Sequence, residues 1–235
     1  MRFACYRSRG HLAVVLPLLL LLPVTRRHGT CLSLRRALVA TLEARAPTLR
    51  LGGGGGSGTG AELLRVADKS SKWLVSLGPV VPVVLRRDFV APFLIVGGIL
   101  AACLGCRLKN WLKQSRPAGT RLADPGMPST HALLATYVAV AWAVYLKSVL
   151  GGVLLLGAAL AVSALRVVCG HHTWAQVAAG AGLGALAACC WMHLGSAWVL
   201  MRSELAAPVW AAYVCGSIAF TMNQHANGKI GRRRT

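Results

Sequence analysis

Residues 109–176 open with KNWLKQSRPAGTRLADPGMPSTH (residues 109–131) and close with RVVCGHHTWAQ (residues 166–176). Both ends carry cations and histidines, whereas the sequence between them is almost entirely apolar and contains one charge, Lys147. Two apolar segments in succession predict two membrane-crossing helices, the second of which returns the chain to the face that it left. We therefore expect the two polar clusters to meet at one boundary of a membrane.

The composition excludes an ordinary soluble domain. Of the 235 residues, 55% are hydrophobic, and the mean hydropathy is +0.57. Several apolar runs approach the length of about 20 residues that a helix needs to cross a bilayer. The expected fold is an all-α, polytopic membrane helix bundle with about five to six spans. The candidate spans are residues 70–85, 89–106, 131–146, 149–168, 174–194 and 205–222.

The first candidate span is the weakest, because it is short and contains Pro79 and Pro82, which kink or end helices. Small residues are frequent in the later spans, as at residues 178–184, and close helix–helix approach explains them. The two predicted spans at residues 131–146 and 149–168 cross the membrane in opposite directions, so residues 107–130 and 166–173 are expected on the same face. Lys and Arg are more numerous on that face, which predicts that it is turned toward cytosol or stroma.

Residues 1–60 are expected to be a targeting segment followed by a linker. They are rich in arginine, contain Glu43 as their single acid, and include an apolar run at residues 12–24 that is short for a span. This composition is typical of an organelle transit peptide. Residues 52–60, GGGGGSGTG, are typical of a flexible linker and lack the Lys-Ser/Thr of a phosphate-binding loop. Residues 61–222 form the expected membrane domain, and residues 223–235 a basic tail.

The charge is strongly unbalanced, at +20, with 26 Lys and Arg against six Asp and Glu. A basic chain often binds nucleic acid. Here the apolar content favours the lipid bilayer and anionic lipid as partners, so no nucleic acid is expected. The few acids argue against two-carboxylate chemistry; they are Glu43, Glu62, Asp68, Asp88, Asp124 and Glu204.

No metal or other cofactor is expected. The eight cysteines lie mostly in apolar runs, where they serve as small packing residues. Cys103 and Cys106 form a CxxC without a second pair at metal-binding spacing. His171 and His172 have no Cys, Asp or Glu at ligand spacing. The oligomeric state stays open.

The cations and the helix start of residues 128–131 suit a phosphoryl group. Lys109 supplies a point charge, while Arg116 and Arg166 each supply a planar fork of donors. Snorkelling of Arg166 from a helix end is the alternative. Ser129 is expected as the N-cap of a helix whose first N–H groups, including that of Thr130, point toward an anion.

Two histidines can carry the chemistry. His131 lies in the first turn of its helix and can give a proton to a leaving-group oxygen. His172 and Gln176 are four residues apart and share a helical face. The Gln176 carbonyl can accept from one ring nitrogen of His172 and so aim the other at phosphorus. His171 is an alternative nucleophile that its spacing from Gln176 disfavours. Fixed donors stabilise the developing charge in such a site.

These residues resemble the motifs of the type 2 phosphatidic acid phosphatases (PAP2), also called lipid phosphate phosphatases. The family patterns K-x6-RP, P-S-G-H and S-R-x5-H-x3-D match residues 109–117, 128–131 and 165–176 in order. Thr130 stands in place of Gly, Leu165 in place of Ser and Gln176 in place of Asp. Gln is usual in the branch that includes plastid lipid phosphate phosphatase gamma and dolichyl-diphosphatase. The resemblance covers roughly residues 70–194.

The resemblance implies a PAP2-like bundle and a role for each motif residue. His172 is the implied nucleophile that becomes phosphohistidine, His131 the acid, and Gln176 the residue that orients His172. The implied phosphate cradle consists of Lys109, Arg116, Ser129, the backbone of Thr130 and Arg166.

The expected function is hydrolysis of a membrane lipid phosphate. Phosphatidate to diacylglycerol in a plastid (chloroplast) membrane is the first choice, favoured by the arginine-rich leader. One alternative is a dolichyl or other polyprenyl diphosphate in the endoplasmic reticulum membrane, where the resemblance implies a lumenal site. A second alternative is a non-catalytic lipid-binding or transport protein on the same scaffold, which predicts that His172→Ala leaves lipid turnover unchanged.

Overall fold

The computed structural model describes residues 62–64, 66–68, 70–71, 75, 78–86, 88–117, 120, 124–195, 199 and 202–232. Within these residues the chain is helical and has no strand, so the predicted all-α class is confirmed. The targeting segment and linker expected at residues 1–60 lie outside the described residues.

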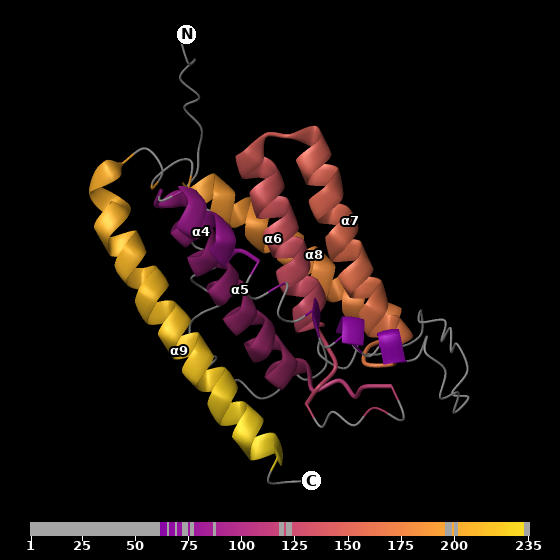
Figure 1. Ribbon diagram of the computed structural model, residues 1–235. Coiled ribbons are helices and arrows are strands. Elements are labelled where there is room, and N and C mark those ends of the chain that lie inside the picture. Colours follow the sequence, from indigo (N-terminus) through magenta and orange to yellow (C-terminus); the bar gives the residue numbers. More distant parts are fainter. Residues whose placement is uncertain are drawn as a thin grey trace, which may run out of the picture.

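From α5 to α9, successive long helices run in opposite directions, so that α6 and α8, which pack together, are parallel (Figure 1). Helix α6 packs against α5, α7 and α8, and α9 lies along the outer side of α5. The turn between α6 and α7 is at one end of the bundle, and the connection between α7 and α8 is at the other. In order, the elements are α4 (Val80–Arg86), α5 (Val90–Leu112), α6 (Thr130–Leu146), α7 (Val149–Val168), α8 (Trp174–Leu194), η2 (Ser203–Leu205) and α9 (Ala206–Arg232).

Four stretches among the described residues are long and apolar enough to cross a membrane. They are Val90–Leu112, Val149–Val168, Trp174–Leu194 and Ser203–Asn223, and the apolar helix α6 is shorter at 17 residues. These five correspond to the predicted spans from residue 89 onward. The predicted first span, residues 70–85, overlaps the seven-residue helix α4, which continues one residue further to Arg86, while residues 72–74 and 76–77 are not described.

Two helices extend beyond their predicted ends. Helix α5 continues to Leu112, so Lys109 lies in its last turn and not in the following loop as expected. A cation in the last turn of a helix is favourable, because it complements the partial negative charge of the C-terminus. The helix ends where Lys113 adopts a left-handed conformation with φ of 49°. Helix α9 likewise runs through residue 222 to Arg232.

The small residues of α8 permit the close approach that the sequence predicts. A Cβ atom at Gly180 would collide with the backbone of Ser129, and one at Gly184 would collide with the backbone of Leu133. The start of α8 therefore lies directly against the start of α6. This contact brings together the start of α6, which contains Thr130 and His131, and the start of α8, which contains Gln176 and follows His172.

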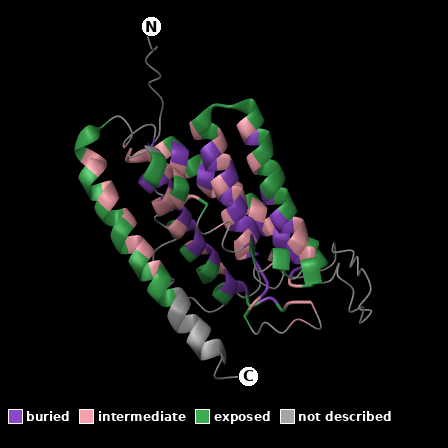
Figure 2. Ribbon diagram, viewed as in Figure 1, coloured by how far each residue is buried: buried purple, intermediate pink, exposed green. Residues whose placement is uncertain are grey.

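The outer surface of the bundle is apolar. Helix α7 exposes several large side chains, and its outward face is mostly exposed in Figure 2. Among them are Val149, Leu150, Val153, Leu154 and Leu160, each more than 60% exposed. Hydrocarbon chains of lipid would cover such a surface, and this agrees with the predicted membrane bundle.

Candidate active site

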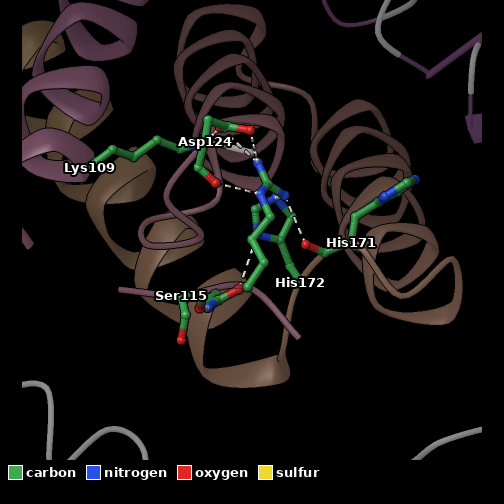
Figure 3. A network of polar contacts seen from close by, with 7 residues as sticks. Lys109, Ser115, Asp124, His171 and His172 are labelled. Carbon is green, nitrogen blue, oxygen red and sulfur yellow. Dashed lines mark hydrogen bonds and ion pairs between the residues drawn. The ribbon is translucent and has the colours of Figure 1, made fainter. Parts of the chain in front are cut away.

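Three chain segments meet at the end of the bundle where α5 and α7 end and α6 and α8 begin. Two backbone hydrogen bonds hold them together. The N–H of Gly126 donates to the carbonyl of Gln114 at 2.8 Å, and the N–H of Ser129 donates to the carbonyl of Gln176 at 3.0 Å. Side chains from distant parts of the sequence thereby enter one polar network (Figure 3).

Arg116 stands at the centre of this network. Its Nη1 donates to Nε2 of His172 at 3.1 Å and to the carbonyl of His171 at 2.8 Å. Its Nε donates to the carbonyl of Asp124 at 2.9 Å, and its Nη2 is 2.8 Å from each carboxylate oxygen of Asp124. A guanidinium has five N–H donors, so each of them has an acceptor within reach. The side chain is only 6% exposed.

The contacts of His172 specify one tautomer. Its Nδ1 lies 3.2 Å from Oε1 of Gln176, an oxygen that can only accept, so Nδ1 carries the proton. On the other side of the ring, Arg116 can only donate, so Nε2 carries the lone pair. Both contacts therefore assign the lone pair to Nε2.

The amide of Gln176 is held in the orientation that this tautomer requires. Its Nε2 donates to the carbonyl of Ser115 at 2.9 Å and contacts Oε1 of Gln114 at 3.4 Å. Its Oε1 also accepts from the N–H of Thr173 at 3.2 Å. If the amide were flipped, Oε1 of Gln176 would face the carbonyl oxygen of Ser115 and Oε1 of Gln114. Gly126 lies so close to this amide that a Cβ atom there would collide with it.

The two adjacent histidines favour their neutral forms. Burial, then the charges of Arg116 and Lys109, lower the pKa of His172 to about 3, while the hydrogen bond that His172 donates to Gln176 acts in the opposite direction. Burial and then Arg166 also lower the pKa of His171, although its contact with Asp68 raises it. At neutral pH, Nε2 of His172 is therefore unprotonated.

Lys109 and Arg116 share one carboxylate. Nζ of Lys109 lies 2.9 Å from Oδ2 of Asp124, the same group that Arg116 contacts. Burial raises the pKa of Asp124, but the hydrogen bonds and charges of Lys109 and Arg116 outweigh it and hold that pKa below its usual value. Asp124 is thus an anion within the predicted phosphate cradle.

Arg166 is buried and paired, so the snorkelling alternative is not what the structure shows. Its Nη1 contacts Oδ1 of Asp68 at 2.6 Å, and Nε2 of His171 lies 3.1 Å from the other oxygen of that carboxylate. The carbonyl of Arg166 accepts from the N–H groups of His171 and His172, which fixes the turn after α7. Within the described part of the chain, its buried Nε has no hydrogen-bond partner.

The start of α6 differs in one detail from the prediction. Ser129 occupies the N-cap position, but its side chain makes no capping hydrogen bond. Its Oγ is buried and, among the described residues, has no partner. Thr130 and His131 are the first two residues of α6, at the same end of the bundle as the other predicted site residues.

Four further residues complete the network, and the sequence analysis assigned none of them a role in the site. Asp124 and Asp68 could have been singled out as two of only six acids in a basic chain. Gln114 and Ser115 lie inside the first motif, at positions that the motif leaves unspecified, and no sequence signal marks them. Among the described residues, no group of three or more His, Cys, Asp or Glu could hold a metal ion.

Comparison with known proteins relates this site to one family. Residues 93–199 match the model of the PAP2 superfamily. The chain is 34% identical over 141 residues to lipid phosphate phosphatase epsilon 1, chloroplastic, from Arabidopsis thaliana, an alignment that covers 57% of this chain and 50% of the relative. It is 32% identical over 154 residues to epsilon 2 of the same plant, covering 61% and 53%. The chain thus spans about half the length of these curated relatives.

A solved structure shares the fold. A transmembrane PAP2-type phosphatidylglycerolphosphate phosphatase from Bacillus subtilis superimposes with a TM-score of 0.53 at 16% sequence identity. The superposition covers 81% of this chain and 98% of the bacterial one. Together with the four long apolar helices, this similarity identifies an integral membrane bundle.

Proposed function

We propose that this chain, whose residues 93–199 match the PAP2 superfamily model, belongs to that superfamily and hydrolyses a membrane lipid phosphate through a phosphohistidine intermediate. The supporting observation is the geometry of His172, whose Nε2 is unprotonated and lies 3.1 Å from Nη1 of Arg116. A phosphoryl group bound to this cation would lie next to the lone pair that attacks it.

The proposed reaction has two steps. Nε2 of His172 attacks phosphorus, the bond from phosphorus to the lipid oxygen breaks, and His131 gives that oxygen a proton. A water molecule then attacks the phosphohistidine, transfers a proton to His131, and releases inorganic phosphate and His172. Gln176 holds Nδ1–H throughout, so the ring stays aimed.

A cradle of donors would hold the phosphoryl oxygens. Lys109, Arg116 and Arg166 provide positive charge from three segments of chain. Two buried donors without partners among the described residues, Oγ of Ser129 and Nε of Arg166, are further candidates to bind the anion. The N–H of Thr130 belongs to the first turn of α6, where anions bind favourably.

We infer that the substrate is phosphatidate, released as diacylglycerol, in a plastid membrane. The site lies at one end of an apolar bundle, where a lipid headgroup would reach it from the bilayer surface. The curated relatives are named chloroplastic lipid phosphate phosphatases. Residues 1–60 would supply the targeting segment and linker, residues 61–222 the catalytic domain, and residues 223–235 the basic tail.

The test is turnover of phosphatidate by the purified full chain, compared with a polyprenyl diphosphate and repeated with a chelator. We expect phosphatidate to be preferred and the chelator to have no effect. His172→Ala should lower turnover by about 10³-fold or more, with radioactive phosphate no longer trapped as an acid-labile adduct. His171→Ala is the matched control and should retain the adduct. Unchanged turnover in His172→Ala would favour a lipid-binding or transport role.

The side of the membrane needs a separate experiment. Ser115 is exposed beside the site, so a cysteine placed there reports which face the site occupies. In intact plastids, we expect a membrane-impermeant maleimide to leave Ser115→Cys unlabelled, because the positive face should be turned toward stroma. Labelling equal to that of an externally exposed control protein would reverse the proposed orientation. The unmodified chain gives the background from native cysteines.

A further inference from the structure

The carboxylate of Asp124 lies among the donors that the proposed function assigns to phosphate. It contacts Nζ of Lys109 at 2.9 Å and Nη2 of Arg116 at 2.8 Å (Figure 3). Two oxygens on one centre, held by two cations, reproduce part of the contact pattern that a phosphoryl group would make. Asp124 is therefore more than a surface ion pair.

The donors of Arg116 are all in use, which limits how a phosphate can enter. Two of them bind backbone carbonyls, those of His171 and Asp124, and these bonds fix the guanidinium to the chain. A third contacts the lone pair on Nε2 of His172, and this contact breaks when that nitrogen attacks phosphorus. The remaining donors on Nη2 are bound by the Asp124 side chain. A phosphoryl oxygen can form a strong hydrogen bond with Nη2 of Arg116 only if the carboxylate of Asp124 loses one of its hydrogen bonds to the same nitrogen.

The surroundings of Asp124 permit its side chain to leave while its backbone stays. Its side chain is 51% exposed, whereas those of Lys109 and Arg116 are 9% and 6% exposed. Two residues later, Gly126 is tied to Gln114 by a backbone hydrogen bond of 2.8 Å. The carboxylate therefore lies on the solvent side of fixed, buried cations, and a side-chain rotation toward solvent frees them.

We propose that Asp124 is an internal anion that occupies the phosphate position between turnovers and is exchanged for the phosphoryl group of the substrate. This inference rests on the proposed function of the same site. A phosphate monoester carries a charge of about −1.5 to −2 and three acceptor oxygens, so it displaces a single carboxylate. When inorganic phosphate is the product, the tethered carboxylate returns and competes with it, because tethering gives it a high effective concentration. Asp124 thus lowers product inhibition.

The test measures binding of inorganic phosphate to the purified full chain by calorimetry, without turnover. Asp124→Asn should bind phosphate about tenfold more tightly than the unmodified chain, because a competing charge-assisted contact is removed. Sulfate should gain by a similar factor, since an internal competitor weakens every ligand of the cradle alike. Asp124→Glu, which keeps the carboxylate, should stay close to the unmodified chain. Glu204→Gln removes the same charge from η2, beyond the far end of α8, and should change nothing.

A phosphate-bound structure gives an independent measurement. We expect phosphate on Arg116 and Lys109, with the Asp124 carboxylate more than 4 Å from Nη2 of Arg116. Equal or weaker phosphate binding by Asp124→Asn, or phosphate bound while the 2.8 Å contact persists, overturns the exchange and leaves the phosphatase proposal intact. If no variant binds phosphate, both proposals fail. Loss of folding in Asp124→Asn, seen by size-exclusion chromatography, would show a structural role instead.

Discussion

Nδ1 of His172 lies 3.2 Å from Oε1 of Gln176, one turn further along the chain at the start of α8. The same Gln176 makes a capping box with Thr173, so its side chain belongs both to the helix start and to the site. Because the amide also donates to the carbonyl of Ser115, its orientation is fixed from three directions. A residue that carries no charge thereby determines which nitrogen of His172 carries the lone pair.

Gln176→Met tests this orienting role. Methionine fills a similar volume but accepts no strong hydrogen bond, so the ring of His172 loses its tautomer preference. We expect kcat for phosphatidate to fall by roughly 10–100-fold, with KM changed little, because partners of this kind contribute about that much. The measurement is steady-state kinetics on the purified protein. Gln114→Met, which removes a weaker partner of the same amide, should cost much less.

We do not expect Gln176→Glu to stabilise the protein, although the family motif carries an acid at this position. In this structure, Nε2 of Gln176 donates to Ser115 and contacts Gln114, and a carboxylate oxygen there would face two carbonyl oxygens. We expect a loss of stability of about 1–3 kcal/mol, typical of a buried group without its partner. Thermal unfolding in detergent measures it. A variant as stable as the unmodified chain would show that Gln114 and Ser115 readjust.

The sequence predicts much of this arrangement because the decisive spacings are local. Apolar runs mark the helices, and the contact of His172 with Gln176 joins residues only four apart. His172 precedes α8, whose N-cap is Thr173, so the two do not share a helical face as predicted; the side chain of Gln176 reaches back to the ring. The contacts of Asp68 and Asp124 could not be predicted in the same way. They join residues 98 apart, in Asp68 and Arg166, or a loop residue to a helix end, and neither follows a periodic pattern. The sequence also did not predict that Oγ of Ser129 lacks a partner among the described residues, because Ser at a helix start normally caps it.

Arg116→Lys tests whether the planar fork is needed. Lysine keeps the charge but cannot contact His172, the His171 carbonyl and Asp124 at once. We expect kcat/KM to fall by about 10²-fold, the loss seen when one fixed donor to a developing charge is removed. Lys113→Ala removes a nearby exposed cation and serves as the control. An equal loss in both variants would indicate a general effect of surface charge.

The pKa of His172 predicts how stability depends on pH. Burial, Arg116 and Lys109 lower the folded-state pKa to about 3, below the usual 6.5. The unfolded chain therefore takes up a proton at a higher pH than the folded one, so this contribution is fully present above pH 6.5 and is lost as the pH falls toward 3. From pH 7 to pH 4, we expect the unmodified chain to lose of the order of 1–3 kcal/mol relative to His172→Asn. Parallel pH profiles of thermal unfolding for the two proteins would contradict the buried, neutral imidazole.

Ser129→Ala separates ligand binding from folding. Oγ of Ser129 is fully buried and, within the described residues, makes no hydrogen bond, so it contributes desolvation cost without a compensating bond. Removing it should leave thermal stability unchanged or slightly raised. Thr173→Ala, by contrast, removes a cap that accepts from the N–H of Gln176 at 3.3 Å and should cost about 1 kcal/mol.

The same Ser129→Ala protein should bind inorganic phosphate and phosphatidate more weakly, by about threefold to tenfold, if Oγ donates to a phosphoryl oxygen. Calorimetry gives the first value and kinetics the second. A buried polar atom that costs stability in the free protein is expected where a ligand provides its partner. Unchanged phosphate affinity together with unchanged stability would remove Ser129 from the cradle and leave its burial without a functional explanation.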